Sequence, residues 1–187
     1  MTFDYQAARL TMVESQVRTN DVTDLTLQDA MRLAPRETLL PPQKALTAYA
    51  DTEIEYAPGR YLMRPRDVAK LLQALKPVAG EKALAIGAPY AAMVLGLMGL
   101  TVDQIEVDGQ PQGAYDVIIT EGAVAEVPAA WTAALADRGR LGVVVRETAA
   151  GKARIYVSTD GRVAWREVFD SHPPYAPGMA PKAQFAF

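Results

Sequence analysis

Short apolar strand patterns alternate with helical patterns from residue 77 onward, and this alternation constrains the fold more than any other feature of the sequence. Strands that are joined through helices run parallel, because each crossover returns the chain to the same end of the sheet. The expected strands are 82–86, 102–107, 115–120 and 140–145, with helices at 90–97 and 127–136. The pattern therefore predicts an α/β fold with a parallel sheet.

Two further strand patterns, 154–158 and 163–169, have no helix between them. Only the turn Thr159-Asp160-Gly161 separates them, and an Asp-Gly turn is typical of a hairpin. We expect these two strands to form an antiparallel hairpin at the edge of the sheet.

The first 76 residues are predicted to be mostly helical. Pro35 ends one helix, because the residue before a proline disfavours helical geometry, and Pro65 suits the first turn of another. The expected helices are 4–18, 25–33, 43–50 and 65–75, and residues 51–65 are expected to be extended with a bend at Pro58-Gly59. We expect a single domain, 1–187, in which an N-terminal helical part (1–76) precedes the sheet (77–187).

Composition excludes several classes of site and partner. There is no cysteine and only one histidine, His172, so disulfides, thiolate metal sites and multi-histidine metal sites are excluded. A formal net charge of -3 is too weak to attract nucleic acid or an anionic membrane. The longest apolar run, Pro89 to Leu100, is too short to cross a bilayer, and the N-terminus does not look like a secretory signal. We expect a cytoplasmic protein that binds no metal, nucleic acid or membrane.

Several strings along the chain carry a family resemblance. They are MVESQVRTNDVTD, LQDAMRLAPRETLLP, TAYADTEI and GRYLMRPRDVAKLLQAL in the first half, and Ala83–Gly87, Tyr115-Asp116-Val117-Ile118 and Gly139-Arg140-Leu141 in the second. In this order they resemble the protein-L-isoaspartate O-methyltransferase family over nearly the whole chain. The string Ala30-Met31 followed by Pro35-Arg36-Glu37 and Pro41 is the most specific part.

The resemblance implies a Rossmann-like methyltransferase fold, S-adenosylmethionine as methyl donor, and an isoaspartyl carboxylate of a damaged peptide as acceptor. A carboxylate is already ionised at neutral pH and attacks the sulfonium methyl directly, so the reaction needs no general base. Rate then comes from holding donor and acceptor in line. For this reason no catalytic residue is assigned, and the candidate residues are binding residues.

The glycine loop after the first strand departs from the family pattern, which is acidic–x–G–x–G–x–G–Y. Here the string is Leu84-Ala85-Ile86-Gly87-Ala88-Pro89-Tyr90. Gly87 is retained as a candidate cofactor residue, but the acidic residue is replaced by Ala85 and both later glycines are missing. Those glycines let the backbone approach a cofactor closely, and Pro89 also lacks an N–H donor.

The second departure is a deletion after the second strand. Glu106 falls where the resemblance places the acid that binds the ribose hydroxyls, with Asp108 as the alternative. The family continues with about 30 residues that form a helix, an outermost strand and the start of another helix. Here residues 109–114 join Asp108 directly to Tyr115, so the adenine pocket and the sheet's outer strand are expected to be missing. For Glu106 the alternative is a solvated carboxylate.

The third departure lies in the expected acceptor site. Met63 replaces the family's serine, and a thioether is only a weak hydrogen-bond acceptor. Arg60, Arg64 and Arg66, with Lys70 nearby, form a candidate anion site, or else a solvated basic face. Glu121 follows a central strand, where α/β folds bind ligands, and is a further candidate for lining the pocket. His172 lies in the loop Ser171-His172-Pro173-Pro174 and is expected to be exposed.

Losing the outer strand would leave strand 102–107 at the sheet edge, and an open edge invites pairing with another chain. The neighbouring segment YAAMVLGLMGL (90–100) has almost no polar face, and such a helix is normally buried. We therefore expect a homodimer or a protein partner that binds through 90–107. The alternative is that the N-terminal helices or the C-terminal tail cover this region.

The departures favour a degenerate family member, in which S-adenosylmethionine is not bound and the chain acts as an interaction or regulatory scaffold. The alternative is an active isoaspartyl methyltransferase whose pocket is completed by dimerisation. A third possibility is that the arginine-rich loop and the residual crevice bind another small anion.

Overall fold

The computed structural model describes residues 3–147 and 150–181. A six-stranded mixed sheet in the order β4-β3-β5-β6-β7-β8 forms the centre of the molecule, and a separate two-stranded sheet pairs β1 with β2. The strands are β1 (Ile54–Ala57), β2 (Arg60–Leu62), β3 (Lys82–Ile86), β4 (Thr101–Ile105), β5 (Tyr115–Val124), β6 (Leu135–Val145), β7 (Lys152–Thr159) and β8 (Arg162–Asp170). The α-helices are α1 (Tyr5–Met12), α2 (Leu25–Leu33), α3 (Pro65–Leu75), α4 (Pro89–Leu97) and α5 (Ala129–Ala133).

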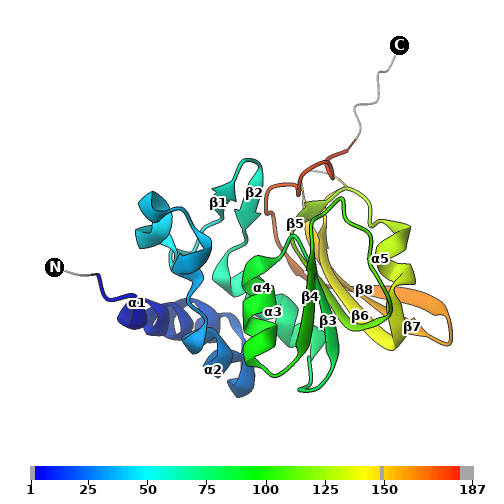
Figure 1. Ribbon diagram of the computed structural model, residues 1–187, viewed down its shortest axis with the longest axis horizontal. Coiled ribbons are helices and arrows are strands. Elements are labelled where there is room, and N and C mark those ends of the chain that lie inside the picture. Colours follow the sequence, from blue (N-terminus) through cyan, green and yellow to red (C-terminus); the bar gives the residue numbers. More distant parts are fainter. Residues whose placement is uncertain (1–2, 148–149, 182–187) are drawn as a thin grey trace, which may run out of the picture.

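The sheet confirms the α/β fold that the alternating patterns predict. β4, β3, β5 and β6 run parallel, whereas β7 and β8 are antiparallel additions that form the expected hairpin. Helices α3 and α4 cover one face of the sheet, the N-terminal helices lie beyond them, and the short α5 lies on the opposite face (Figure 1).

The helix predicted at 127–136 is wrong in length, since α5 covers only Ala129–Ala133 and β6 begins at Leu135. Leu135 pairs with Tyr115 at the start of β5 and is buried, so sheet pairing ends the helix early. At Gly139 an added Cβ would lie 2.7 Å from the carbonyl oxygen of Tyr115. This close approach of two backbones explains why β6 carries a glycine at this position.

The N-terminal part is helical, but less regularly than predicted. The single helix expected over 4–18 is α1 followed by a π-helical turn (Val13–Val17) and a 3-10 turn (Arg18–Asn20). The segment expected as a helix at 43–50 is a 3-10 helix over Pro42–Thr47, and a second 3-10 helix covers Arg36–Leu39. Helices α2 and α3 have the predicted bounds, and the bend at Pro58-Gly59 joins β1 to β2.

Two apolar cores lie on the two faces of the sheet. The larger one joins the N-terminal part to the sheet through residues such as Met31, Leu72 and Val94, so the helical part and the sheet share one core. Helix α4 packs against α2 and buries Tyr90, Val94 and Leu95, and its exposed large side chain is Leu97.

Part of the expected partner surface over 90–107 is therefore covered within the chain. The helical half is buried by the N-terminal helices, which is the alternative that the sequence left open. β4 is the outermost strand on its side of the described sheet, and Thr101 and Gln104 are exposed. A partner at this edge remains a prediction, restricted to the strand.

Over residues 3–147 and 150–181, no helix is both long and apolar enough to cross a membrane. The same residues contain no cluster of three or more histidine and acidic side chains arranged to hold a metal ion.

A buried acid, Asp67, ties α3 to the segment after β8. The Ser171 hydroxyl donates to Asp67 Oδ2 at 2.6 Å, and both side chains are buried. Burial raises the pKa of the Asp67 carboxyl above its usual range, although the hydrogen bond from Ser171 offsets part of this shift. The folded state therefore binds this proton more tightly than the unfolded chain. Asp67 contributes stability below its unfolded pKa, and that contribution is lost as pH rises through the folded pKa.

The Asp67→Asn variant removes this titration, so its free energy of unfolding relative to wild type should rise as pH increases from the unfolded pKa, about 4, through the raised folded pKa. Urea unfolding at several pH values measures the difference. Asp170→Asn is a control of opposite sign, because Lys152 lowers the pKa of the Asp170 carboxyl. A difference for Asp67→Asn that falls with pH would contradict the assignment.

Candidate functional site

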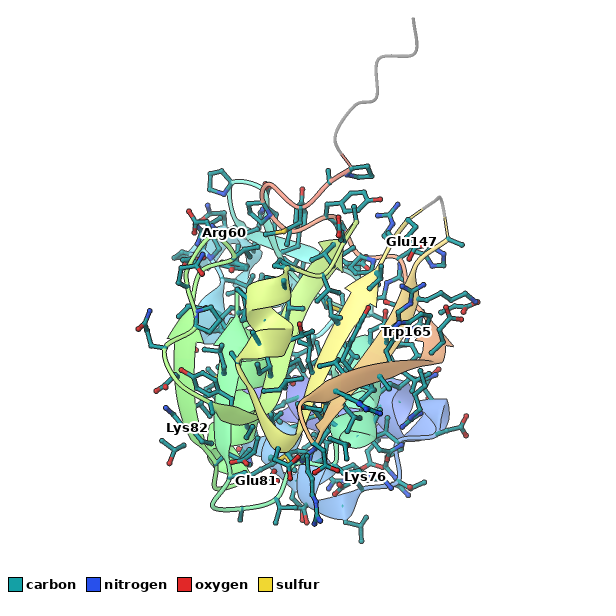
Figure 2. The ribbon with its side chains drawn as sticks, turned by 90° about the vertical axis from the view of Figure 1, so that its right-hand side faces the viewer. Arg60, Lys76, Glu81, Lys82, Glu147 and Trp165 are labelled. Carbon is teal, nitrogen blue, oxygen red and sulfur yellow. The ribbon has the colours of Figure 1, made fainter. Side chains whose placement is uncertain are left out.

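The carboxyl ends of β3, β4 and β5 bring the three candidate cofactor residues together at one edge of the sheet. Gly87 follows β3, Glu106 follows β4, and Glu121 lies within the extended β5. This is the edge near Arg60 in Figure 2, opposite the end where Glu81 and Lys82 are labelled. In a parallel sheet with these connections, ligands bind in the crevice beyond these strand ends.

Glu121 is buried, and its carboxylate accepts three backbone N–H groups. Oε1 accepts from Tyr90 and Ala91 at 2.9 Å each, and Oε2 accepts from Met63 at 3.0 Å. Pro89 at the first position of α4 has no N–H, and the Ala92 N–H donates to the carbonyl of Ala88. Glu121, which lies on β5, therefore caps the N-terminus of α4. It accepts the N–H groups that a helix N-terminus would otherwise offer to a bound anion.

A buried arginine that the sequence analysis did not select lies beside this cap. Arg36 donates from Nε to the Ala48 carbonyl at 2.8 Å and from Nη2 to the Met63 carbonyl at 2.6 Å. Its guanidinium lies 4.5 Å from the centre of the Tyr90 ring. The backbone of Met63 therefore contacts both Glu121 and Arg36, because its N–H donates to Glu121 and its carbonyl accepts from Arg36. Arg36 belongs to the string Pro35-Arg36-Glu37, which was the available signal.

Burial controls the ionisation of this cluster. It raises the pKa of the Glu121 carboxyl, and the charge of Arg36 and the three N–H donors offset part of that rise. Burial also lowers the pKa of the Arg36 guanidinium and raises the pKa of the Tyr90 hydroxyl. Two buried polar atoms of the cluster, Arg36 Nη1 and the Tyr90 hydroxyl, have no hydrogen-bond partner among the described protein residues.

Gly87 lies against β4, and one side of it is closed by a side chain. Its φ is +54°, and its N–H donates to the Ile105 carbonyl at 2.8 Å. A Cβ at this position would lie 2.7 Å from Cγ2 of Val107. The space beside this glycine is therefore filled by a valine side chain.

Glu106 and the three candidate arginines are distributed among separate ion pairs. Arg60 pairs with Glu106, Arg64 Nε lies 2.8 Å from Glu53, and Arg66 Nη1 lies 3.2 Å from Asp51. Because each guanidinium already faces an acid of the chain, the arginines do not form one convergent anion site. Lys70 lies over the ring of Phe169, 4.8 Å from its centre.

The segment after β8 crosses the same edge of the sheet. The Ala123 N–H donates to the Pro174 carbonyl at 2.9 Å, and the Ala176 N–H donates back to the Ala123 carbonyl at 2.8 Å. The Tyr175 hydroxyl donates to the carbonyl of Arg146, and the Arg146 guanidinium lies over the Tyr175 ring. Ala176 lies so close to Gly122 that a Cβ there would be 3.3 Å away. His172 is exposed, as expected.

Beside Gly87 and Glu121 the crevice is reduced to a cavity of about 10 Å³. Its lining includes Tyr56, Gly87, Glu106, Glu121 and Tyr175. A cavity of this size holds about one water molecule. Further out lies an open pocket of about 290 Å³, which is lined by Arg60, Glu106, Val107, Asp108, Pro177 and Gly178. The inner cavity beside the altered glycine loop therefore has no room for S-adenosylmethionine.

The chain is similar in sequence to known proteins. It is 32% identical over 172 residues to the protein-L-isoaspartate O-methyltransferase of Methylorubrum extorquens, a match that covers 76% of this chain and 75% of that protein. It is also 32% identical over 169 residues to the Methylorubrum populi protein of the same name, covering 74% of this chain and 80% of the relative. No family model matches the chain.

Solved structures show the same fold. A Plasmodium falciparum structure described as a protein-L-isoaspartate O-methyltransferase in complex with S-adenosyl-L-homocysteine superimposes with a TM-score of 0.74 at 14% identity. That match covers 94% of this chain and 99% of the other. A second protein-L-isoaspartate O-methyltransferase gives a TM-score of 0.70 at 18% identity, covering 94% of this chain and 66% of the other. By its sequence relatives, with the fold in agreement, the chain belongs to the protein-L-isoaspartate O-methyltransferase family.

Proposed function

We propose that this chain is a degenerate family member that does not bind S-adenosylmethionine and acts as an interaction or regulatory scaffold. The observation that carries the proposal is the position of Glu121. Its carboxylate takes the N–H groups of Tyr90 and Ala91 at the start of α4, beside the strand end where the family's glycine loop begins. A ligand would have to displace a buried, triply hydrogen-bonded carboxylate.

Two further observations support the proposal. The segment through Ala176 is hydrogen bonded along β5, and the cavity beside Gly87 and Glu121 is only about 10 Å³. Glu106, the candidate ribose ligand, faces Arg60. Opening the site would therefore require breaking main-chain hydrogen bonds and an ion pair in addition to moving Glu121.

Calorimetric titration with S-adenosylmethionine and S-adenosylhomocysteine tests the proposal. We expect no heat of binding up to roughly 1 mM ligand, which corresponds to a binding free energy weaker than about -4 kcal/mol. The Plasmodium falciparum protein, whose structure contains S-adenosyl-L-homocysteine, is the positive control. A dissociation constant near 1 μM, or about -8 kcal/mol, would contradict the scaffold function.

The alternative is an active isoaspartyl methyltransferase whose pocket is completed by a second copy at β4. It is favoured by the place of β4, which is the outermost strand on its side of the described sheet and precedes Glu106 directly. If cofactor binding is found, the Glu106→Ala variant should weaken it only when a ribose contacts this residue. Sedimentation of wild type with and without cofactor would then show whether binding requires a dimer.

A further inference from the structure

The opposite edge of the sheet, at β8, carries an exposed aromatic surface. β8 spans nine residues, and it has no strand partner on its outer side among residues 3–147 and 150–181. Trp165 is 51% exposed and Val163 is 43% exposed. Figure 2 shows Trp165 and Glu147 on the face of the sheet that carries α5.

The turn geometry sets which backbone groups of β8 face outward. The hairpin loop is Asp160-Gly161, both with positive φ, and it is closed by the pair Thr159 and Arg162. In such a turn the N–H of the last residue bonds back to the first, so Arg162 faces β7. Facing alternates along the strand, so the N–H and C=O groups of Val163 and Trp165 point to the free edge.

The side chains of these two residues lie in one groove. It has a volume of about 370 Å³, lies between α5 and the β7–β8 hairpin, and is lined by apolar residues that include Val127, Val145, Tyr156, Val163 and Trp165. The same two residues therefore offer a docking strand both backbone hydrogen bonds and an apolar platform. Adding a strand to an exposed sheet edge is a recurring mode of peptide recognition.

The aromatic platform, the ring of Trp165, is held in place by contacts with Arg154 and Tyr156 on β7. The Arg154 guanidinium lies 4.2 Å from the centre of the Trp165 ring, and the Tyr156 and Trp165 ring centres are 6.2 Å apart. Arg154 is itself fixed by Glu147 at 2.8 Å and Glu167 at 3.4 Å. A platform that is already ordered loses little side-chain entropy on binding.

Charge around the groove defines the class of partner. Three carboxylates, those of Glu126, Glu147 and Glu167, lie in or beside it, against the single guanidinium of Arg154. Glu126 is exposed, and the Glu147 side chain is 62% exposed. Because three carboxylates face one guanidinium, the excess negative charge favours a cationic residue of the partner next to the apolar ones.

We infer that the β8 edge and the groove beside it bind an extended segment of a protein partner. The segment carries alternating apolar or aromatic side chains, next to a lysine or arginine that meets Glu126 and Glu147. This inference rests on the proposed scaffold function and names the surface and the chemistry through which it operates.

Selection from a displayed library of random dodecapeptides on the full chain tests the inference. We expect enriched peptides that alternate apolar and polar residues next to a basic one. Synthetic consensus peptide is then titrated calorimetrically. Binding should also shift the fluorescence of Trp165, because the only other tryptophan, Trp131, is buried. A library without enrichment, or with acidic consensus sequences, would overturn the inference.

Two variants separate backbone from side-chain recognition. Val163→Pro removes an outward N–H and no bond to β7, and Trp165→Ala removes the platform. Each should weaken the consensus peptide at least tenfold, as should N-methylation of alternate peptide bonds of the peptide. Phe3→Ala, which removes an exposed aromatic ring at the N-terminus, is the matched control and should leave affinity unchanged.

Equal binding by wild type and both variants would overturn the inference. So would a wild-type dimer that dissociates in Trp165→Ala, because a second copy would then be the occupant. Cofactor titration keeps the two proposals separate. Absence of both cofactor and peptide binding would refute this docking surface alone, whereas tight cofactor binding would refute the scaffold function.

Discussion

Replacing Glu121 with alanine is expected to destabilise the protein by about 3–5 kcal/mol, the loss typical of breaking a buried charge network on one side. The substitution removes the acceptor of three buried N–H groups, those of Met63, Tyr90 and Ala91. It also removes the buried acid whose charge acts on Arg36. Urea unfolding at neutral pH, compared with wild type, measures the loss.

Glu126→Ala is the matched control for this prediction. Glu126 lies five residues further along the same segment but is exposed, so its loss should change stability by no more than about 0.5 kcal/mol. A change of that size in Glu121→Ala would mean that water replaces the carboxylate at no cost. The Glu121 cap could then be displaced by a ligand, and the main support for an unbound cofactor site would be lost.

A double-mutant cycle separates the cap from the electrostatic pairing. Arg36→Met removes the guanidinium and its bonds to the Ala48 and Met63 carbonyls. If Glu121 and Arg36 stabilise one another, the double variant should lose less than the sum of the two single variants. Strict additivity would show that the two groups act independently.

Replacing Gly151 with alanine is expected to destabilise the protein by about 3 kcal/mol, at the upper end for overpacking. Gly151 is buried, and a Cβ there would lie 2.1 Å from the Ser171 carbonyl oxygen and 2.7 Å from Cγ of Arg146. The Ser171 N–H donates to the Gly151 carbonyl at 3.1 Å, so the two backbones cannot separate without losing this bond. The clash therefore strains the backbone at Ser171, where the segment after β8 begins to cross the crevice.

Gly96→Ala is the matched control, and it is expected to stabilise the protein. Gly96 lies in α4, and no atom lies within 4 Å of its added Cβ. Alanine is the better helix former, so this variant should gain about 0.5–1 kcal/mol. Thermal and urea unfolding of the two variants side by side make the comparison. Equal stabilities would show that the Gly151 contact relaxes freely.

The sequence predicted those features that depend on neighbouring residues. The bounds of α2, α3 and β3 and the 159–162 hairpin follow from apolar spacing, proline positions and turn residues, which act over a few residues. The altered glycine loop and the short 109–114 connection were also readable. The observed bounds differ from the predicted ones where residues far apart in the sequence pair. An example is Leu135, which pairs with Tyr115 and ends α5.

The contents of the site were decided by the tertiary structure. Glu121 was a candidate for lining a pocket, but its partners Tyr90 and Met63 lie 31 and 58 residues away, so no local pattern could reveal that it fills the site. Arg36 likewise has no local feature that marks it as buried. The sequence by itself determined the fold family and the loss of the cofactor motifs. Only the packing of separate segments decided which residues fill the crevice, because hydrogen bonds between distant residues exist only once the chain has folded.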